Sequence, residues 1–406
     1  MDKPIVLDVF SGAGGMSEGF IQAGFDVAFA CDINKMAELT YMNRHEQLGF
    51  KSKFACINIE KFAEKKFLKE FLEGNKIDVV CGGPPCQGFS LAGKRDKCDP
   101  RNILFRSYIK VIKNVKPKYF VMENVEGILS MKFDEFVGVS GTIYNNNTVP
   151  EILTKEFYKI GYHVEWRVLQ ANDYGVPQSR KRVFFLGHKI KKTKDGGYKS
   201  LITPPVFPVR SVDKNISANE AIDDLSFLEH SHSSSSYNTL VNISEYQKES
   251  IKGRTPRVHG ETINSKTIFN HQASRHSKLV VERFNQICQG ESLVAVRERL
   301  GQEVWGKIQT KKLRCQRIKS NEPSPTVLTL PDDLVHYSKN RIMTVREFAR
   351  LQSFDDSFQF LGKRTTGGDK RKIELPQYSQ VGNAVPPLMA KAVAMEILKA
   401  IVQTEN

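Results

Sequence analysis

The 406-residue chain has no apolar run approaching the roughly 18 residues needed to cross a bilayer, which argues against a membrane-spanning protein. Its first residues, Met1-Asp2-Lys3-Pro4, lead directly into a short apolar segment and lack the pattern of a signal peptide. The seven cysteines are odd in number and irregularly spaced, so they suggest no disulfide framework. We therefore expect a cytoplasmic protein with reduced thiols and no membrane contact.

Acidic residues are also scarce relative to basic ones. The 60 Lys and Arg outnumber the 45 Asp and Glu and leave a net charge of +15, which favours a polyanionic partner such as nucleic acid. The excess is uneven, because residues 191–330 carry 22 Lys and Arg against 14 Asp and Glu. A solvated basic face is the alternative interpretation of this region.

Neither the G-x-G-x-x-G dinucleotide fingerprint nor a phosphate loop is present. Instead, an apolar strand at 5–10 is followed by Ser11-Gly12-Ala13-Gly14-Gly15, and a helix is predicted from 16 to 23. Glycines at such a turn let backbone N–H groups approach a ligand at the positive end of the helix. A second strand, 27–31, ends in Asp32, which is placed to bind ribose hydroxyls or to cap the next helix. Together these features favour an adenosine-containing cofactor.

An apolar segment rich in β-branched residues is expected to form a strand that stops at Gly82-Gly83-Pro84-Pro85, and a cysteine follows directly. Cys81 lies on the apolar strand and is expected to be a core residue. Cys86 stands beyond it on a stiff loop, at the sheet edge where ligands of open α/β sheets bind. Cys86 is therefore a candidate nucleophile.

Two further strands contribute polar side chains to the same edge. The strand 118–125 carries Glu123 near its end, which makes Glu123 a candidate general acid beside Cys86. Before the strand 183–187, Gln178, Arg180 and Arg182 alternate along an extended segment and are expected to share one face. Two guanidinium groups on one face suit a phosphate or a base carbonyl, and a solvated edge is the alternative.

After about residue 191 the alternation of strands and helices fades and basic clusters occur at Arg254-Thr255-Pro256-Arg257 and Lys311-Lys312-Leu313-Arg314. The histidines and scattered cysteines of this region show no metal-binding pattern, so no metal is assigned. Helices are predicted again from Thr344 to Gln352 and from Leu388 to Val402.

The chain resembles the C5-cytosine-specific DNA methyltransferases of the bacterial restriction–modification type. The resemblance rests on five or six stretches in the family's order, of which the most specific are Gly83-Pro84-Pro85-Cys86-Gln87-Gly88-Phe89-Ser90, Glu123-Asn124-Val125, Gln178-x-Arg180-x-Arg182 and Gln380-Val381-Gly382-Asn383-Ala384-Val385-Pro386. It implies an α/β fold with a Rossmann-like, S-adenosylmethionine-dependent methyltransferase sheet and a smaller, irregular target-recognition domain. The expected domains are 1–192, completed by 373–406, and 193–372, with a variable region at about 193–322.

The resemblance also implies the cofactor and the residues that bind it. S-adenosylmethionine would contact Phe10, Ser11, Gly12, Ala13, Gly14, Gly15, Asp32, Ile33, Asn58, Pro84, Asn383 and Ala384. Asn58, expected at the end of a strand 54–59, stands where the family usually has Asp, and its amide oxygen can accept the same hydrogen bond. Phe348 and Asp355 are two other departures, both expected in a structural helix.

By the same resemblance, the reaction is methylation of carbon 5 of a cytosine flipped out of double-stranded DNA. Catalysis would use Cys86, Glu123, Arg182 and, more weakly, Arg180, whereas Pro85, Gln87, Asn124 and Val125 would face the base. A monomer that works alongside a cognate restriction endonuclease is expected. The alternatives are cytosine methylation in RNA, a non-catalytic nucleic-acid-binding protein, and a thiol redox protein, which would require a C-x-x-C pair.

Overall fold

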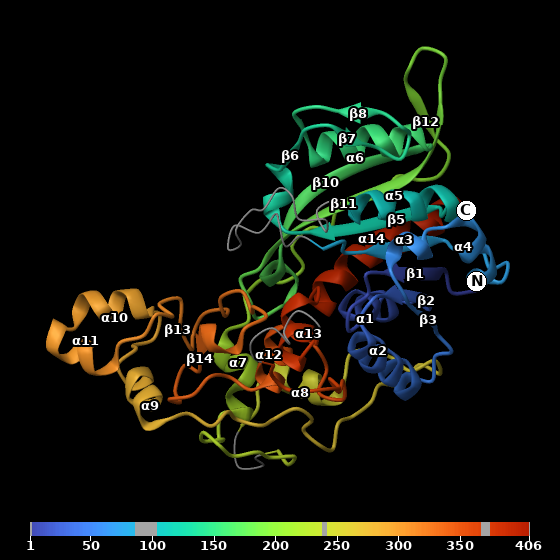
Figure 1. The fold of residues 1–406 in the computed structure, drawn as a ribbon. Helices are drawn as coiled ribbons and strands as arrows, with labels where there is room; N and C mark the ends of the chain where they lie inside the picture. The colour runs from blue at the N-terminus through green and yellow to red at the C-terminus, as the bar shows by residue number, and fades with distance from the viewer. Residues whose placement is uncertain (1, 86–103, 238–241, 367–373, 406) are drawn as a thin grey trace.

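The central feature of the molecule is a mostly parallel sheet (Figure 1). The structure, a computed structural model, describes residues 2–85, 104–237, 242–366 and 374–405. Five parallel strands lie in the order β5-β4-β1-β2-β3, and β11 and then β10 extend the sheet beyond β5. β11 is antiparallel to both of its neighbours, and β12 pairs with its far end. The strand bounds are β1 Ile5–Val9, β2 Asp26–Asp32, β3 Lys53–Cys56, β4 Val79–Gly82, β5 Tyr119–Asn124, β10 Tyr162–Gln170, β11 Lys181–Lys192 and β12 Tyr198–Ser200.

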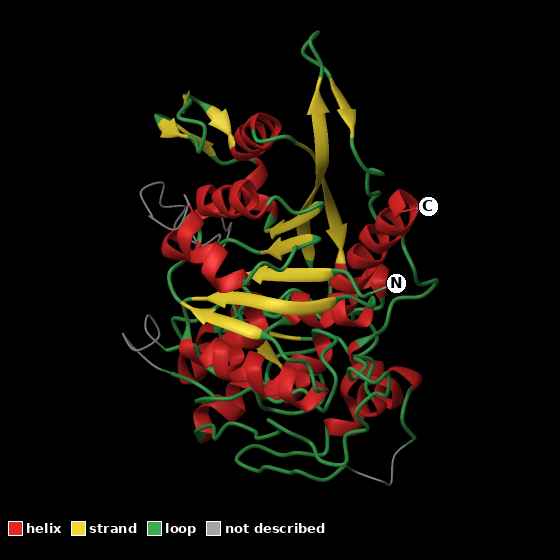
Figure 2. Cartoon of the chain, turned by 90° about the vertical axis from the view of Figure 1, so that its right-hand side faces the viewer, coloured by secondary structure: helices red, strands yellow, loops and turns green. Residues whose placement is uncertain are grey.

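Helices cover both faces of this sheet, as Figure 2 shows, because its central strands are apolar on both sides. One face packs against α1 (Gly15–Gln22) and α14 (Pro387–Glu405), which share a hydrophobic cluster with β1, β4 and β5. The approach is close, since a Cβ on Gly19 would lie 2.5 Å from the Cβ of Ala390. The other face is covered by α3 (Ile59–Phe62), α4 (Lys65–Leu72), α5 (Leu104–Val115) and α6 (Val149–Lys159). The expected Rossmann-like α/β sheet is confirmed.

Further helices surround two smaller cores away from the sheet. One core contains α12 (Val345–Leu351), whose N-cap Thr344 forms a capping box with Glu347. Its neighbours include α7 (Ala218–Ile222), α8 (Glu245–Lys252) and α13 (Gln377–Asn383). The second core lies among α9 (Lys278–Asn285), α10 (Leu293–Arg299), α11 (Gln302–Ile308), β13 (Gln316–Arg317) and β14 (Leu334–Val335).

Buried charges hold the first of these cores together. The Arg350 guanidinium donates hydrogen bonds to the carboxylates of Asp224 and Asp356, and all three side chains are almost fully buried. Breaking such a pair leaves an uncompensated buried charge and typically costs about 3–5 kcal/mol. In the described part of residues 193–372, specific buried ion pairs therefore stabilise the fold together with apolar packing.

Several sequence-based boundaries need correction. The third strand ends at Cys56 instead of Ile59, because Asn58 is the N-cap of α3 and accepts a hydrogen bond from the Glu60 N–H. β11 runs to Lys192, beyond the predicted end at Gly187. Asp355 lies outside α12, whereas Phe348 is inside it as expected. The helix expected after Asp32 is the 14-residue α2 (Lys35–Leu48). The sequence patterns predict neither α13 nor the short strands β6 (Lys132–Phe133), β7 (Phe136–Val137), β8 (Ile143–Tyr144) and β9 (Asn147–Thr148).

Candidate active site

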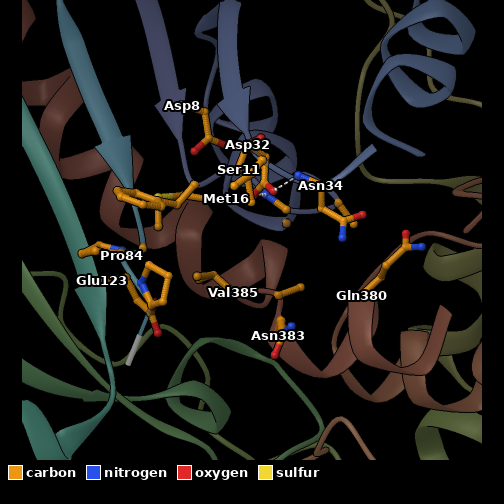
Figure 3. A pocket seen from close by; sticks show the side chains of 18 of the residues that line it. Asp8, Ser11, Met16, Asp32, Asn34, Pro84, Glu123, Gln380, Asn383 and Val385 are labelled. Atoms are coloured by element: carbon orange, nitrogen blue, oxygen red, sulfur yellow. Dashed lines mark hydrogen bonds between the residues drawn. The ribbon is translucent and has the colours of Figure 1, made fainter. Parts of the chain in front are cut away.

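A cavity of about 410 Å³ opens at the carboxyl ends of β1, β2, β4 and β5, with α13 on its other side (Figure 3). Its wall brings together most of the site residues predicted from the sequence. These are Phe10, Ser11, Gly12, Ala13, Gly15, Asp32, Ile33, Asn58, Pro84, Pro85, Glu123, Asn124, Val125, Arg180, Arg182, Asn383 and Ala384. Gly14 is the N-cap of α1 and does not line the wall, and Cys86 and Gln87 lie outside the described residues.

The turn after β1 has the backbone conformation that its glycines predict. Gly12 and Gly14 have positive φ angles of 54° and 96°, and Phe10 adopts the left-handed region at 57° although it is not a glycine. A Cβ on Gly15 would lie 2.3 Å from the carbonyl oxygen of Val385, so the turn also packs directly on the chain that follows α13. The turn, α1 and the C-terminal segment thus form one wall of the cavity.

The Asp32 side chain binds two backbone N–H groups at the cavity, one from the glycine turn and one from the start of α2. Its carboxylate accepts hydrogen bonds from the Gly12 N–H at 3.0 Å and the Asn34 N–H at 2.8 Å. Burial raises the pKa of Asp32, and these hydrogen bonds partly offset the effect. The alternative role as a helix N-cap is excluded, because Asn34 caps α2 by accepting from the Met36 N–H. Asp32 therefore ties the glycine turn to the end of β2 while it lines the cavity.

Apolar surface lies next to Asp32. The side chain of Ile33 is 68% exposed although it lines the cavity, which leaves a large apolar group available to a flat ligand. Asn58 also reaches the wall, but its side-chain oxygen already accepts the Glu60 N–H at 2.8 Å. The amide oxygen of Asn58 has a second lone pair and its nitrogen can donate, so the acceptor role expected from the sequence stays a prediction.

The base of the Cys86 loop is held by Asn124. Its side-chain nitrogen donates to the Pro84 carbonyl at 3.0 Å, and its oxygen accepts the Val125 N–H at 2.9 Å. Gly83 passes so near β5 that a Cβ there would lie 2.9 Å from the Glu123 carboxylate. These contacts fix residues 83–85 against the end of β5, and Asn124 acts on the loop instead of projecting freely toward a base.

Glu123 and Arg182 form an ion pair at the cavity wall, with Arg182 Nε 2.9 Å from Glu123 Oε1. Glu123 is paired in register with Phe184 on β11, so Arg182 is its diagonal neighbour on the same face of the sheet. Burial raises the pKa of Glu123, and the charges of Arg182 and Arg180 partly offset this rise. The arrangement is a carboxyl group that favours its protonated form more than an exposed glutamate does.

The side chains of Arg180 and Gln178 form hydrogen bonds to backbone groups of this protein. The sequence led us to expect that they would bind a phosphate or a base carbonyl instead. Arg180 is 2% exposed and donates to the carbonyl oxygens of Val327, Gly382 and Ala384. Gln178 accepts the Val327 N–H and donates to the Leu351 carbonyl. The extended segment before β11 therefore fastens the chain around 327 and the end of α13 to the cavity, and Arg182 is the member of the trio that reaches Glu123.

Asp8 is a cavity residue that the sequence reading missed. It is 1% exposed in β1, and the Ser17 hydroxyl donates to its carboxyl group at 2.6 Å. Burial raises the pKa of Asp8 to about 7, which keeps a large fraction protonated near neutral pH. An acidic residue inside an apolar strand is the sequence signal that could have identified it.

No group of three or more His, Cys, Asp or Glu side chains in the described stretches is arranged to hold a metal ion. No helix in the same stretches is long and apolar enough to cross a membrane.

Replacing Arg180 tests how the cavity wall is fastened. Arg180→Met should lower the free energy of unfolding by about 2–4 kcal/mol, because three buried carbonyl groups lose their donor. Denaturant unfolding monitored by fluorescence measures the effect. The control Arg210→Met removes a half-exposed guanidinium paired with Asp173 and should cost less than about 1 kcal/mol. Equal losses in the two variants would contradict the assigned role of Arg180.

Comparison with known proteins adds independent information on this site. Residues 5–399 match the family model described as C-5 cytosine-specific DNA methylase. The type II methyltransferase M.DdeI of Desulfomicrobium norvegicum is 36% identical over 97% of this chain and 88% of its own. M1.HphI of Haemophilus parahaemolyticus, also a type II methyltransferase, is 33% identical over 97% of this chain and 86% of its own.

A solved structure supports the fold. An E. coli prophage-encoded protein described as a DNA modification methyltransferase superposes with a TM-score of 0.71. The alignment covers 98% of this chain and all of the other, at 23% sequence identity. At that identity the likeness bears on the fold alone.

Proposed function

Since the chain belongs to the C-5 cytosine-specific DNA methylase family, we propose that the cavity is where a cytosine flipped out of duplex DNA receives a methyl group from S-adenosylmethionine. One observation carries the proposal. The glycine turn, Asp32, the start of the Cys86 loop and the Glu123–Arg182 pair all line the same cavity. A nucleoside-binding end and a proton-donating end are therefore adjacent, as a transfer between two bound molecules requires.

The residues of the cavity fit S-adenosylmethionine. Asp32 lies where a carboxylate can accept hydrogen bonds from ribose hydroxyls, and the exposed face of Ile33 can pack on adenine. The buried Ser11 hydroxyl oxygen has no hydrogen-bond partner among the described residues, so it is available to a polar ligand group. Asn383 and Ala384 would enclose the cofactor from the end of α13. When bound, S-adenosylmethionine supplies the methyl group from its sulfonium centre.

Asp32→Ala is expected to weaken cofactor affinity by about 10- to 100-fold, because it removes both the ribose acceptor and the carboxylate that orders the Gly12 turn. Titration calorimetry with S-adenosylmethionine measures the loss. Asp195→Ala, in the exposed turn beyond β11, is the control and should leave affinity unchanged. An unchanged dissociation constant in Asp32→Ala would remove Asp32 from the proposed cofactor site.

The proposed chemistry begins with Cys86 and Glu123. Carbon 5 of cytosine is too weak a nucleophile to take a methyl group directly. The Cys86 thiolate therefore adds to carbon 6 while Glu123 protonates ring nitrogen 3, so that carbon 5 gains enamine character. Carbon 5 would then take the methyl group as its bond to the cofactor's sulfonium breaks, and the sulfur would leave as a neutral thioether. Transfer of the carbon 5 proton to a base such as water would restore the double bond and expel the thiolate, and nitrogen 3 would return its proton to Glu123.

The surrounding residues have supporting roles in this proposal. Arg182 holds the Glu123 carboxyl group in place and can donate to the cytosine carbonyl at the same wall. Arg180 acts more weakly, through the chain segments that it binds. Pro84 and Pro85, with Val125, would limit how the flipped base can lie, and Asn124 would fix the loop that carries Cys86. Gln87 would lie beside the base.

Residues 1–192 with 373–406 would form the catalytic and cofactor-binding domain, and residues 193–372 the target-recognition domain. The latter contains the basic, variable region at about 193–322, in which Lys and Arg beyond the β11–β12 hairpin can hold phosphates while other side chains reach base edges. The naming of the relatives as type II methyltransferases supports a role in a restriction–modification system. We extend the proposal to a cytoplasmic monomer that protects host DNA from a cognate endonuclease.

A transfer assay tests the function directly. The protein is incubated with methyl-labelled cofactor and either plasmid DNA of diverse sequence or RNA transcripts of the same sequence. We expect label on carbon 5 of cytosine in DNA and not in RNA, at one sequence identifiable by bisulfite sequencing. Label in RNA alone would favour the alternative of RNA methylation, and label in neither would refute the proposal.

A further inference from the structure

The two basic clusters of the middle region differ in burial. Arg254 is nearly buried, and its backbone N–H and guanidinium bind the Asp355 carboxylate. Thr255 donates to the buried carboxylate of Glu18, which also binds Arg44. Arg254 and Thr255 are therefore part of the internal structure, whereas Arg257 at the end of that cluster is exposed. Lys311, Lys312 and Arg314 are instead exposed, at the end of the segment that contains α9, α10 and α11.

Residues 278–315, the α9–α11 unit, form a small body with its own core. Its buried residues Phe284, Leu293, Val296, Trp305 and Ile308 form one cluster, to which Val335 and Ile342 also contribute, and this cluster is separate from the core around α12. Figure 1 shows the unit projecting from the rest of the molecule. Its sequence carries eight Lys and Arg against four Glu. A projecting unit with its own core can present a rigid surface to a partner, and its charge favours a polyanion.

The outer surface of the unit combines apolar and basic side chains. Val294 on α10 is 37% exposed and Val304 on α11 is 43% exposed, although neighbouring residues of both helices form the core. Arg297 is exposed three residues after Val294, which places both on one face of α10. Among the described residues, neither Arg297 nor Lys311 has an ion-pair partner. These side chains are available to a ligand that is both charged and partly apolar.

The unit is connected to the cavity through a short, hydrogen-bonded route. β13 directly follows the unit and pairs with β14, and Ser292 at the start of α10 is bridged to Gln316. The chain beyond β13 then pairs with the segment before β11, where the Ser179 N–H donates to the Ser324 carbonyl. Arg180, at the cavity wall, binds Val327 in the same stretch. The position of the unit is thereby fixed relative to the site where the base would be methylated.

We propose that exposed side chains of the α9–α11 unit, namely Val294, Arg297, Val304 and Lys311, read the target sequence in the major groove of the DNA; this rests on the proposed function. Arg297 and Lys311 supply donors for guanine edges and phosphates, and the two valines supply apolar contact for thymine methyl groups. The Arg254 cluster and the β11–β12 hairpin have no part in reading.

The experiment compares two double variants of equal charge. R297Q/K311Q changes the proposed surface, and K191Q/K194Q changes exposed lysines of the β11–β12 hairpin. The hairpin extends past the amino-terminal end of β5, at the opposite edge of the sheet from the cavity. We expect R297Q/K311Q to weaken binding of the methylated target duplex by about tenfold or more, and K191Q/K194Q to weaken it less than about threefold. Calorimetry should give the same cofactor affinity for both variants and the wild type, which shows that the cavity is folded.

A third variant, V294A/V304A, tests reading as distinct from affinity. Methylation of a random-sequence library, followed by bisulfite sequencing, should show relaxed preference at one or more positions of its target, by about fivefold or more. If Val294 and Val304 do not contact bases, the sequence preference of V294A/V304A should equal that of the wild type. If the wild type methylates DNA while R297Q/K311Q binds normally and V294A/V304A keeps the wild-type profile, the reading surface is refuted and the proposed function stands. If the wild type methylates no DNA, the proposed function itself fails, and this inference with it.

Discussion

Cys86→Ser should lower methyl transfer to DNA by on the order of 10⁴-fold or more, because a serine hydroxyl is far less ionised than a thiol and cannot add efficiently to carbon 6. Binding of cofactor and of target DNA should change little, since neither requires the covalent bond. Initial rates with labelled cofactor, together with the two dissociation constants, measure these effects. The matched control is Cys288→Ser, which makes the same chemical change at an exposed cysteine of the α9–α10 segment and should retain full activity.

Trapping the covalent intermediate tests the same role in the wild-type protein. Duplex DNA with 5-fluorocytosine at the target position should form a stable adduct, because fluorine cannot leave carbon 5 as a proton does. Mass spectrometry of the digested complex should place the nucleotide on Cys86. Formation of the adduct by Cys86→Ser, or attachment at another residue, would overturn the assignment of the nucleophile.

Glu123→Gln is the second change with a large expected effect. Glutamine can donate a hydrogen bond to ring nitrogen 3 but cannot transfer a proton, so kcat should fall by about 10²- to 10⁴-fold. KM for DNA should change much less, because the substitution preserves the shape of the cavity wall. The comparison variant Glu165→Gln alters an exposed glutamate of β10 and should match the wild type.

The pH profile gives a second measure of the role of Glu123. Its pKa is raised by burial, so the protonated acid persists to a higher pH than in an exposed glutamate and is lost as pH rises through that pKa. Activity that depends on this acid should decline on the alkaline side, whereas formation of the Cys86 thiolate increases with pH. In Glu123→Gln the alkaline decline should be absent. An unchanged decline in that variant would assign it to another group.

Local sequence patterns predict the parallel strands and the turns that follow them. β1, β4 and β5 are short apolar runs that stop at glycine, proline or polar residues, and the ends of such strands meet at one sheet edge. This rule predicts that Glu123 shares a sheet edge with the Cys86 loop, and the cavity wall at that edge contains Glu123, Asp32 and Pro84. The resemblance to a methyltransferase family then supplied Asn383 and Ala384, which no local pattern connects to the glycine turn.

What the sequence did not reveal depends on partners distant in the chain. Arg180 was expected to face a ligand, but its acceptors are carbonyl groups of residues 327, 382 and 384. Asp355 was expected in a helix, and its role is to bind Arg254 and lie 3.7 Å from Arg44. No periodicity encodes such pairs, because each partner is specified only once the tertiary structure has formed. The same holds for Asp8, whose hydroxyl donor comes from α1.

The packing of α14 on α1 has a consequence for how the protein matures on the ribosome. Both ends of the chain meet on one side of the sheet, and the wall of the cavity includes Asn383, Ala384 and Val385 (Figures 1 and 2). During synthesis β1 and α1 emerge first, but the part of the apolar face that α14 covers stays exposed until α14 has been made. A nascent chain would therefore complete the proposed methylation site late. A chain released early would expose an apolar surface that chaperones and proteases recognise.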